Sequence, residues 1–115
     1  MEIYGMAFIT TIDVLGLTST EYRAILDQMG VEKKPEPGLY LHLTARIEGG
    51  YRITEVWDSR ENFDAFMEAR LAPGAEAIGL QRQMTITMEP LYNIFAPRLA
   101  ELPALVETAA GRPTP

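Results

Sequence analysis

Residues 39–58, LYLHLTARIEGGYRITEVWD, decide the fold of this chain. Aromatic and β-branched residues are frequent in both halves of the segment, as is typical of strands. Between the halves, Gly49 and Gly50 can take the positive φ angles that a tight hairpin turn requires. The segment is therefore predicted to form a β-hairpin.

The predicted pairing of the hairpin defines two faces. With the two glycines as the central turn residues, His42 is expected opposite Trp57 and Thr44 opposite Glu55. One face then resembles the polar wall of a cavity, and it carries Tyr40, His42, Thr44, Arg46, Ile53, Glu55 and Trp57. The other face is expected to pack against helices, and it carries Leu39, Leu41, Leu43, Ala45, Thr54 and Val56.

The composition indicates a single globular domain. The chain has 115 residues, of which 47% are hydrophobic, with no cysteine and a formal net charge of −6. An acidic chain without a basic run disfavours nucleic acid and anionic membranes as partners. Because there is no cysteine, no secretion signal pattern and no long apolar run, we expect a soluble cytoplasmic protein.

The remaining elements follow from periodicity and caps. Residues 3–12 are expected to form a first strand, with Tyr4, Met6 and Phe8 on one side. A capping-box pattern at residues 18–21 and a stop at Gly30 predict a helix between them. A second helix is expected from Ser59 until Pro73-Gly74 interrupts it, and the alternation in residues 83–89 predicts a last strand. Residues 90–97, PLYNIFAP, are expected to form an extended arm, and residues 98–115 a tail that is partly helical or disordered.

This order, β-α-β-β-α-β, predicts an α+β domain over residues 1–97 with the ferredoxin-like fold: a four-stranded antiparallel sheet with two helices on one face. We expect the first and third strands to lie parallel. The face left open would expose Tyr4, Met6, Phe8, Ile53 and Trp57, an apolar patch larger than monomers usually carry. A homodimer packed sheet against sheet, with PLYNIFAP crossing to the partner, is therefore predicted.

The run GGYRITEVWDSRENFDAFMEARLAP (residues 49–73) resembles the hairpin-to-helix signature of the dimeric α/β-barrel superfamily, which includes the antibiotic-biosynthesis monooxygenases. The most specific part of the resemblance is Gly49-Gly50, Val56-Trp57-Asp58-Ser59, Phe63 and Phe66. The resemblance implies a homodimer whose sheets enclose a cavity for a small hydrophobic or aromatic ligand in each subunit. It also implies oxygenation or proton-transfer chemistry without a cofactor, because an electron-rich substrate anion can itself reduce dioxygen.

Two residues are the candidate catalytic groups. His42 is the only histidine, and histidine is the residue type suited to proton transfer near neutral pH, so it is a candidate general base for a phenol, an enol or an acidic C–H. Glu55 would orient the imidazole or act as an acid or base itself. The alternatives are a histidine hydrogen-bonded within a dimer interface and a glutamate paired with Arg46 or Arg52.

Candidate ligand-binding residues line the same predicted face: Trp57, Tyr40, Thr44, Tyr4, Met6 and Phe8. For Trp57, a place in the core or interface is the alternative to a stacking floor for a planar ligand. No dinucleotide, phosphate-loop, zinc-protease or serine-hydrolase motif occurs, so neither a metal nor a cofactor is expected. A non-catalytic binding or interaction module remains the competing class of function.

Overall fold

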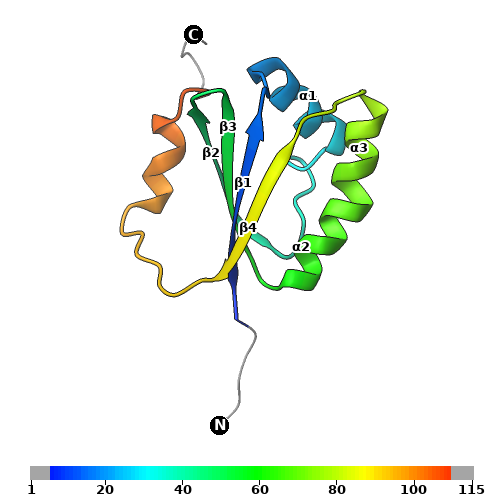
Figure 1. Cartoon of the computed structure of the whole chain (residues 1–115). Helices are drawn as coiled ribbons and strands as arrows, with labels where there is room; N and C mark the ends of the chain where they lie inside the picture. Colours follow the sequence, from blue (N-terminus) through cyan, green and yellow to red (C-terminus); the bar gives the residue numbers. More distant parts are fainter. Residues whose placement is uncertain (1–5, 110–115) are drawn as a thin grey trace.

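The computed structural model describes residues 6–109, which form a four-stranded sheet covered on one face by helices. The strands are β1 (Phe8–Leu15), β2 (Leu39–Ile47), β3 (Gly50–Trp57) and β4 (Met84–Pro90), in the sheet order β2-β3-β1-β4. Figure 1 shows the sheet with α1, α2 and α3 on one side. The predicted ferredoxin-like α+β fold is confirmed.

The strand directions differ from the prediction in one respect. β1 is antiparallel to both of its neighbours, β3 and β4, and β2 is antiparallel to β3. The prediction that the first and third strands lie parallel is therefore wrong. The helix after β1 carries the chain past one strand position, so β1 and β2 are parallel with β3 inserted between them.

The first helix begins and ends where the sequence indicates. Thr18 is the N-cap of α1 (Ser19–Met29), and its side chain and that of Glu21 form the reciprocal bonds of a capping box. Gly30 ends the helix with a φ of 67°, a left-handed conformation that glycine adopts at little cost.

The second helical segment is continuous, whereas the sequence predicts a break at Pro73-Gly74 with a further helical turn possible over residues 75–79. Ser59 caps α2 (Arg60–Phe66), which continues directly into the π-helix η1 (Met67–Leu71) and then α3 (Ala72–Ala77). The predicted interruption at Pro73-Gly74 is wrong, because the helix continues through Pro73 directly after the π-helical turn of η1, in which the Ala72 N–H donates to the carbonyl oxygen of Met67. Gly74 is buried against Met29 and Ile25 of α1, so its lack of a side chain lets the two helices approach.

The hairpin forms, with its turn shifted by one residue. Ile47 pairs with Gly50, so the central turn residues are Glu48 and Gly49, and Gly49 has a φ of 79°. Gly50 serves another purpose, because a Cβ atom there would lie 2.2 Å from the carbonyl oxygen of Val14. The turn shift moves every pair by two residues.

His42 consequently lies opposite Glu55, and Thr44 lies opposite Ile53. The predicted pairs of His42 with Trp57 and Thr44 with Glu55 are wrong. A shift of two residues keeps the side chains from Leu41 onward on their predicted faces, because strand side chains alternate with a period of two. Before Leu41 a β-bulge breaks the alternation, so Leu39 lies opposite Trp57 and lines the helix-covered face. His42, Thr44 and Glu55 therefore still share a face.

The two faces of the sheet have exchanged their predicted roles. Trp57 is 0% exposed and packs against Phe63 and Phe66, whose ring centroids lie 5.8 and 5.3 Å from its own. The helices thus cover the face of His42 and Trp57, while Leu41 and Leu43 lie on the uncovered face. Burial of the three aromatic rings together stabilises this arrangement.

The first strand starts later than predicted, and Tyr4 lies outside the described residues. Met6 precedes β1 and is 53% exposed, and Phe8 is partly buried at the start of the strand. The expected exposed patch of Met6, Phe8, Ile53 and Trp57 is not present, because Trp57 is enclosed by the helices.

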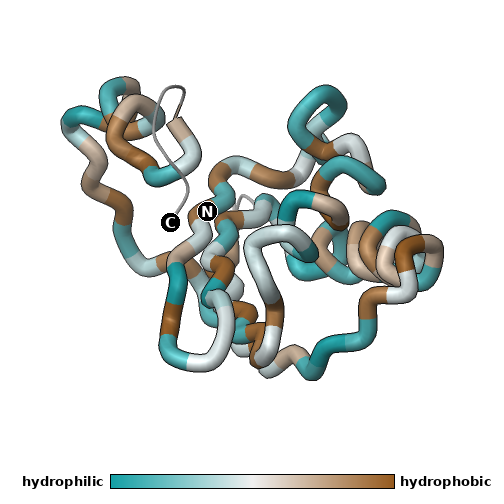
Figure 2. Tube along the Cα trace, turned by 90° about the horizontal axis from the view of Figure 1, so that it is seen from above, coloured by the Kyte–Doolittle hydropathy of each residue, from teal (hydrophilic) through white to brown (hydrophobic). Residues whose placement is uncertain are grey.

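The C-terminal segment lies on the other side of the sheet from α1 to α3 (Figure 2). Residues 91–96 have no regular secondary structure, as expected for an arm, and η2 (Leu99–Leu105) is a short 3-10 helix containing Pro103. Glu107 reaches back to Arg46 of β2, with 3.1 Å between the Arg46 Nε and a carboxylate oxygen. Within residues 6–109, no helix has the length and apolar character needed to cross a membrane.

Candidate functional site

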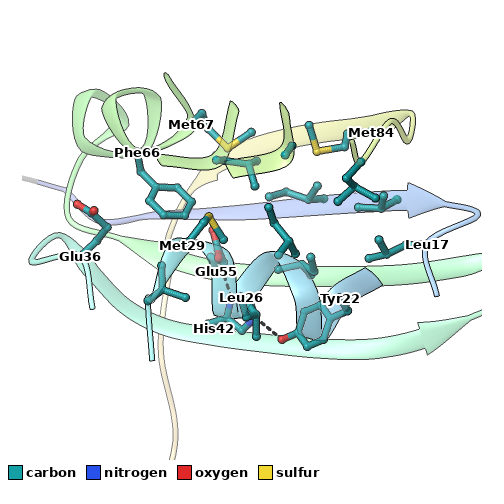
Figure 3. A pocket seen from close by; sticks show the side chains of 18 of the residues that line it. Leu17, Tyr22, Leu26, Met29, Glu36, His42, Glu55, Phe66, Met67 and Met84 are labelled. Carbon is teal, nitrogen blue, oxygen red and sulfur yellow. Dashed lines mark hydrogen bonds and ion pairs between the residues drawn. The ribbon is translucent and has the colours of Figure 1, made fainter. Parts of the chain in front are cut away.

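A cavity of about 410 Å³ lies between the sheet and the helices of a single chain. Its walls are mainly aliphatic and thioether side chains from β1, α1, η1 and β4, some of which Figure 3 shows as sticks. The volume falls within the range of roughly 300–1,000 Å³ that is common for small-molecule pockets. The prediction placed the cavity between the two sheets of a dimer, whereas this cavity is formed by one chain.

Three polar side chains meet on the wall of this cavity: Glu55 from β3, His42 from β2 and Tyr22 from α1 (Figure 3). The Nδ1 atom of His42 lies 2.7 Å from Oε2 of Glu55. Its Nε2 atom lies 2.8 Å from the hydroxyl of Tyr22. The carboxylate, imidazole and phenol therefore form one continuous hydrogen-bonded chain.

The partners of Glu55 define the tautomer of His42. The indole Nε1–H of Trp57 donates to Oε1 of Glu55 at 2.9 Å, and Oε2 accepts from Nδ1 of His42. A carboxylate only accepts hydrogen bonds, so Nδ1 carries a proton. In the neutral imidazole, Nε2 then has the lone pair and can accept a proton.

Two hydroxyls surround this lone pair. The Thr44 Oγ1 lies 3.0 Å from Nε2 of His42 and 2.8 Å from the hydroxyl of Tyr22. Each hydroxyl has one proton to donate, so one of them bonds Nε2 while the other bonds its neighbour. A ligand hydroxyl could replace either one without leaving the other unbonded.

Burial distinguishes the members of this chain. Glu55 is 5% exposed, and a carboxylate that far from water requires the hydrogen bonds of Trp57 and His42. Burial raises the pKa of the Tyr22 phenol, although its bond to Thr44 acts in the opposite direction. Tyr22 is thus held as a neutral donor at pH 7. Among the described residues, no buried side-chain nitrogen or oxygen lacks a hydrogen-bond partner.

The predicted ligand-binding residues are only partly brought together. Thr44 bonds both His42 and Tyr22. Trp57 is completely buried behind Glu55, so it supports the carboxylate and does not line the cavity. The β-bulge between Leu39 and Leu41 leaves Tyr40 72% exposed and away from the cavity.

Met6 and Phe8 do not line the cavity either, and Tyr4 is outside the described residues. Met6 precedes the strand, and Phe8 lies on the cavity-side face of β1 but at the end of the strand away from the cavity. β1 instead contributes Ile12 and Val14, which are nearer its C-terminal end.

Tyr22 was missed by reasoning from sequence. Its spacing with Ile25, Leu26 and Met29 places its ring in the apolar stripe of α1, which is correct for the ring but gives its hydroxyl no role. Tyrosine in a helix stripe that faces a sheet needs a polar partner for its hydroxyl, and His42 and Thr44 are among the polar residues on that sheet face. That requirement was the available signal.

No group of three metal-ligating side chains in residues 6–109 is arranged to hold a metal ion. The one histidine is occupied on both ring nitrogens by protein groups.

Comparison of the sequence with protein families and with curated proteins found no match to either. Comparison of the structure with solved structures gave several matches. The cofactor-independent oxygenase SnoaB from Streptomyces nogalater matches with a TM-score of 0.57 and 14% identity, over 79% of this chain and 97% of that one.

Two further solved structures are similar. A protein from Deinococcus radiodurans assigned to the antibiotic biosynthesis monooxygenases matches with a TM-score of 0.56 and 18% identity, over 76% of this chain and 95% of that one. The hydroxynitrile lyase of Passiflora edulis matches with a TM-score of 0.56 and 10% identity, over 79% of this chain and 98% of that one. This chain therefore has a ferredoxin-like fold, and it shares that fold with solved structures that include antibiotic-biosynthesis monooxygenase-like proteins.

Proposed function

We propose that this protein binds a small, largely apolar molecule of aromatic or polyketide-like structure and that His42 removes a proton from it. The observation that carries the proposal is the hydrogen-bonded chain from Glu55 through His42 to Tyr22 on the wall of an apolar cavity. Glu55 fixes the tautomer with Nε2 as the acceptor, and its negative charge stabilises the imidazolium that forms.

The proton acceptor lies in apolar surroundings, which favour this reaction. Ile12, Ile53 and Met29 line the same cavity, so a bound molecule would displace water from around His42. An ionic interaction between Glu55 and the new imidazolium is stronger in such a medium than in water. Tyr22 would then donate its hydrogen bond to the ligand oxygen on which negative charge develops.

Reaction of the anion with dioxygen is the form of this chemistry that the fold favours, since one of the structural matches is a cofactor-independent oxygenase. For a substrate with an activated CH₂ group, the carbanion transfers an electron to dioxygen and the two radicals combine as a peroxide. Loss of water then leaves a carbonyl. The CH₂ carbon is oxidised to C=O, one oxygen atom is retained, and the other leaves as water.

A hydroxyanthrone is a suitable probe, because it is planar and largely apolar and its CH₂ group is acidic. We expect the wild-type protein to accelerate both dioxygen uptake and quinone formation with it. His42→Gln should remove the acceleration, and Asp13→Asn, a change on the other face of the sheet, should retain it. If His42→Gln were as fast as wild type, the assignment of His42 as the base would be wrong.

A non-catalytic binding protein is the second candidate function. The observation that favours it is that the polar chain is already satisfied within the protein, with both His42 nitrogens bonded to Glu55 and Tyr22. Such a chain can simply hold β2, β3 and α1 together. In this case the hydroxyanthrone would bind without being converted.

A homodimer is proposed as the state in which the uncovered face of the sheet is buried. Leu41 and Leu43 lie on this face, which the helices leave open, and Leu43 is 42% exposed. The arm beyond β4 carries Tyr92 and Phe95, whose side chains are 101% and 89% exposed in a single chain. Contiguous apolar surface of this kind usually marks an interface. Native mass spectrometry should find twice the chain mass, and a monomer would contradict the proposal.

A further inference from the structure

The charged groups around the cavity are already paired with one another. Arg82 is the one guanidinium among the residues that line the cavity, and its Nη2 lies 3.0 Å from Oε2 of Glu21. His42 is bonded to Glu55 at 2.7 Å. Within the described part of the chain, no cation on the cavity wall is therefore left to meet an anionic ligand.

The carboxylates at the cavity are paired as well. Glu36 lies 2.7 Å from Nη1 of Arg70, and Glu32 forms an ion pair with Arg23. Glu55 accepts two hydrogen bonds from His42 and Trp57. A cationic ligand would have to break one of these pairs, and an anionic ligand would meet three carboxylates, Glu32, Glu36 and Glu55.

Hydrogen-bonding capacity is concentrated at one place on the wall. A ligand hydroxyl that takes the place of Tyr22 or Thr44 at His42 Nε2 would find an acceptor in Nε2 and a donor in the remaining hydroxyl, which lies within 3.0 Å of Nε2. The ligand group that matches both is a hydroxyl, which donates one hydrogen bond and accepts others. Apart from Gln81 and the paired charges of Glu32, Glu36 and Arg82, the remaining wall is apolar, so additional polar groups on a ligand that face it would be buried without partners.

From these observations, and resting on the proposed function, we propose that the cavity selects uncharged molecules that carry one hydroxyl at the end facing His42. Carboxylates, sulfonates and phosphates are excluded. The substrate class is therefore neutral phenols and enols without acidic substituents.

Three ligands with the same ring system test this selectivity: naphthalene, 1-naphthol and 1-naphthoate, each competing at pH 7 against the neutral fluorescent probe N-phenyl-1-naphthylamine. A hydrogen bond contributes a few-fold to tenfold in affinity, so 1-naphthol should bind roughly threefold to tenfold more tightly than naphthalene. 1-Naphthoate should bind about tenfold more weakly than 1-naphthol or worse, because its charge would be buried without a partner.

Tyr22→Phe distinguishes the contribution of the Tyr22 hydrogen bond to ligand affinity from the contribution of the cavity shape. The ring that lines the cavity is retained while the hydroxyl is lost, so the advantage of 1-naphthol over naphthalene should shrink and the affinity for naphthalene should stay unchanged. Equal losses for both ligands would show that Tyr22 acts through the shape of the cavity, and the hydroxyl assignment would be overturned.

Glu21→Gln tests the charge argument by gain of function. Glutamine retains the capping box of α1 but leaves Arg82 at the cavity without its anionic partner. The affinity for 1-naphthoate should rise severalfold, while that for 1-naphthol stays constant. Glu107→Gln is the matched control, since it removes the carboxylate partner of Arg46, an arginine that does not line the cavity.

The outcomes separate this inference from the proposed function. If 1-naphthoate binds wild type as tightly as 1-naphthol, the selectivity for uncharged ligands is refuted and the cavity remains a binding site. If the probe does not bind, or neither naphthalene nor 1-naphthol displaces it, binding of small aromatic molecules in this cavity is refuted, and the proposed function with it.

Discussion

Glu55→Gln should reverse the tautomer of His42 while leaving the fold intact. The glutamine side chain has nearly the same shape as glutamate, but one oxygen becomes an NH₂ donor. Trp57 Nε1–H can only donate, so the amide oxygen of the glutamine must face Trp57. The NH₂ group then faces Nδ1 of His42, which has to become an acceptor, and the proton moves to Nε2.

The size of the preference for this amide orientation follows from the free-energy cost of the opposite one. If the amide were turned round, the Trp57 N–H and the glutamine NH₂ would face each other in a buried place, leaving donors unsatisfied at about 1–3 kcal/mol. That cost favours the expected orientation by roughly fivefold to 150-fold. Exchanging charge-assisted bonds for neutral ones should lower the free energy of unfolding by about 1–2 kcal/mol, and loss of the general base should reduce any turnover by roughly 100-fold or more.

Nitrogen-15 NMR of the imidazole measures the tautomer directly, and His42 is the only histidine in the 115 residues, so its assignment is unambiguous. Wild type should show a protonated Nδ1 and Glu55→Gln a protonated Nε2. Asp13→Asn, which removes a carboxylate paired with Arg52 on the other face, should retain the wild-type pattern. A protonated Nδ1 in Glu55→Gln would refute the assignment of donors and acceptors in this chain.

Three further predictions concern stability and assembly. Gly50→Ala should lower the free energy of unfolding by about 3 kcal/mol, because its Cβ would lie 2.2 Å from the Val14 carbonyl oxygen. Gly49→Ala should lower it by only about 1–2 kcal/mol, because Gly49 has a φ of 79° but no neighbour within 4 Å of the added Cβ. Urea denaturation of both variants measures the difference. Burial raises the pKa of Tyr22, so its contribution to stability is complete below the pKa of an unfolded tyrosine, about 10, and is lost as the pH rises through the folded value. Tyr22→Phe should therefore show a smaller alkaline loss of stability in denaturation curves than wild type, and an identical loss would contradict this origin. Leu43→Asp should convert the proposed dimer to a monomer in sedimentation experiments without unfolding the chain, since Leu43 is 42% exposed on the uncovered face.

The fold could be predicted from sequence because its signals are local. The capping box at Thr18, the stop at Gly30 and the alternation of the hairpin each depend on neighbouring residues. The grouping of His42 with Glu55 on one face also survived a wrong turn position, because the error of two residues preserved the alternation.

The site could be predicted only in part, because it depends on packing between distant elements. Which face the helices cover is decided by the burial of Trp57 against Phe63 and Phe66, and the strand pattern alone does not contain that information. Tyr22 reaches His42 across 20 positions in the sequence, from a helix whose rotation is set by the same packing. The bulge that turns Tyr40 outward likewise has no signal in the residue types around it.

The central claim is that His42, oriented by Glu55, accepts a proton from a molecule bound in the cavity. The most direct test is the loss of deuterium from the CH₂ position of a deuterated hydroxyanthrone without dioxygen, which separates proton transfer from oxygenation. Wild type should accelerate the loss over buffer, and His42→Gln and Glu55→Gln should not. The claim would be contradicted if the hydroxyanthrone bound to wild type but lost deuterium only at the rate seen in buffer. It would also be contradicted if all three proteins accelerated the loss of deuterium equally.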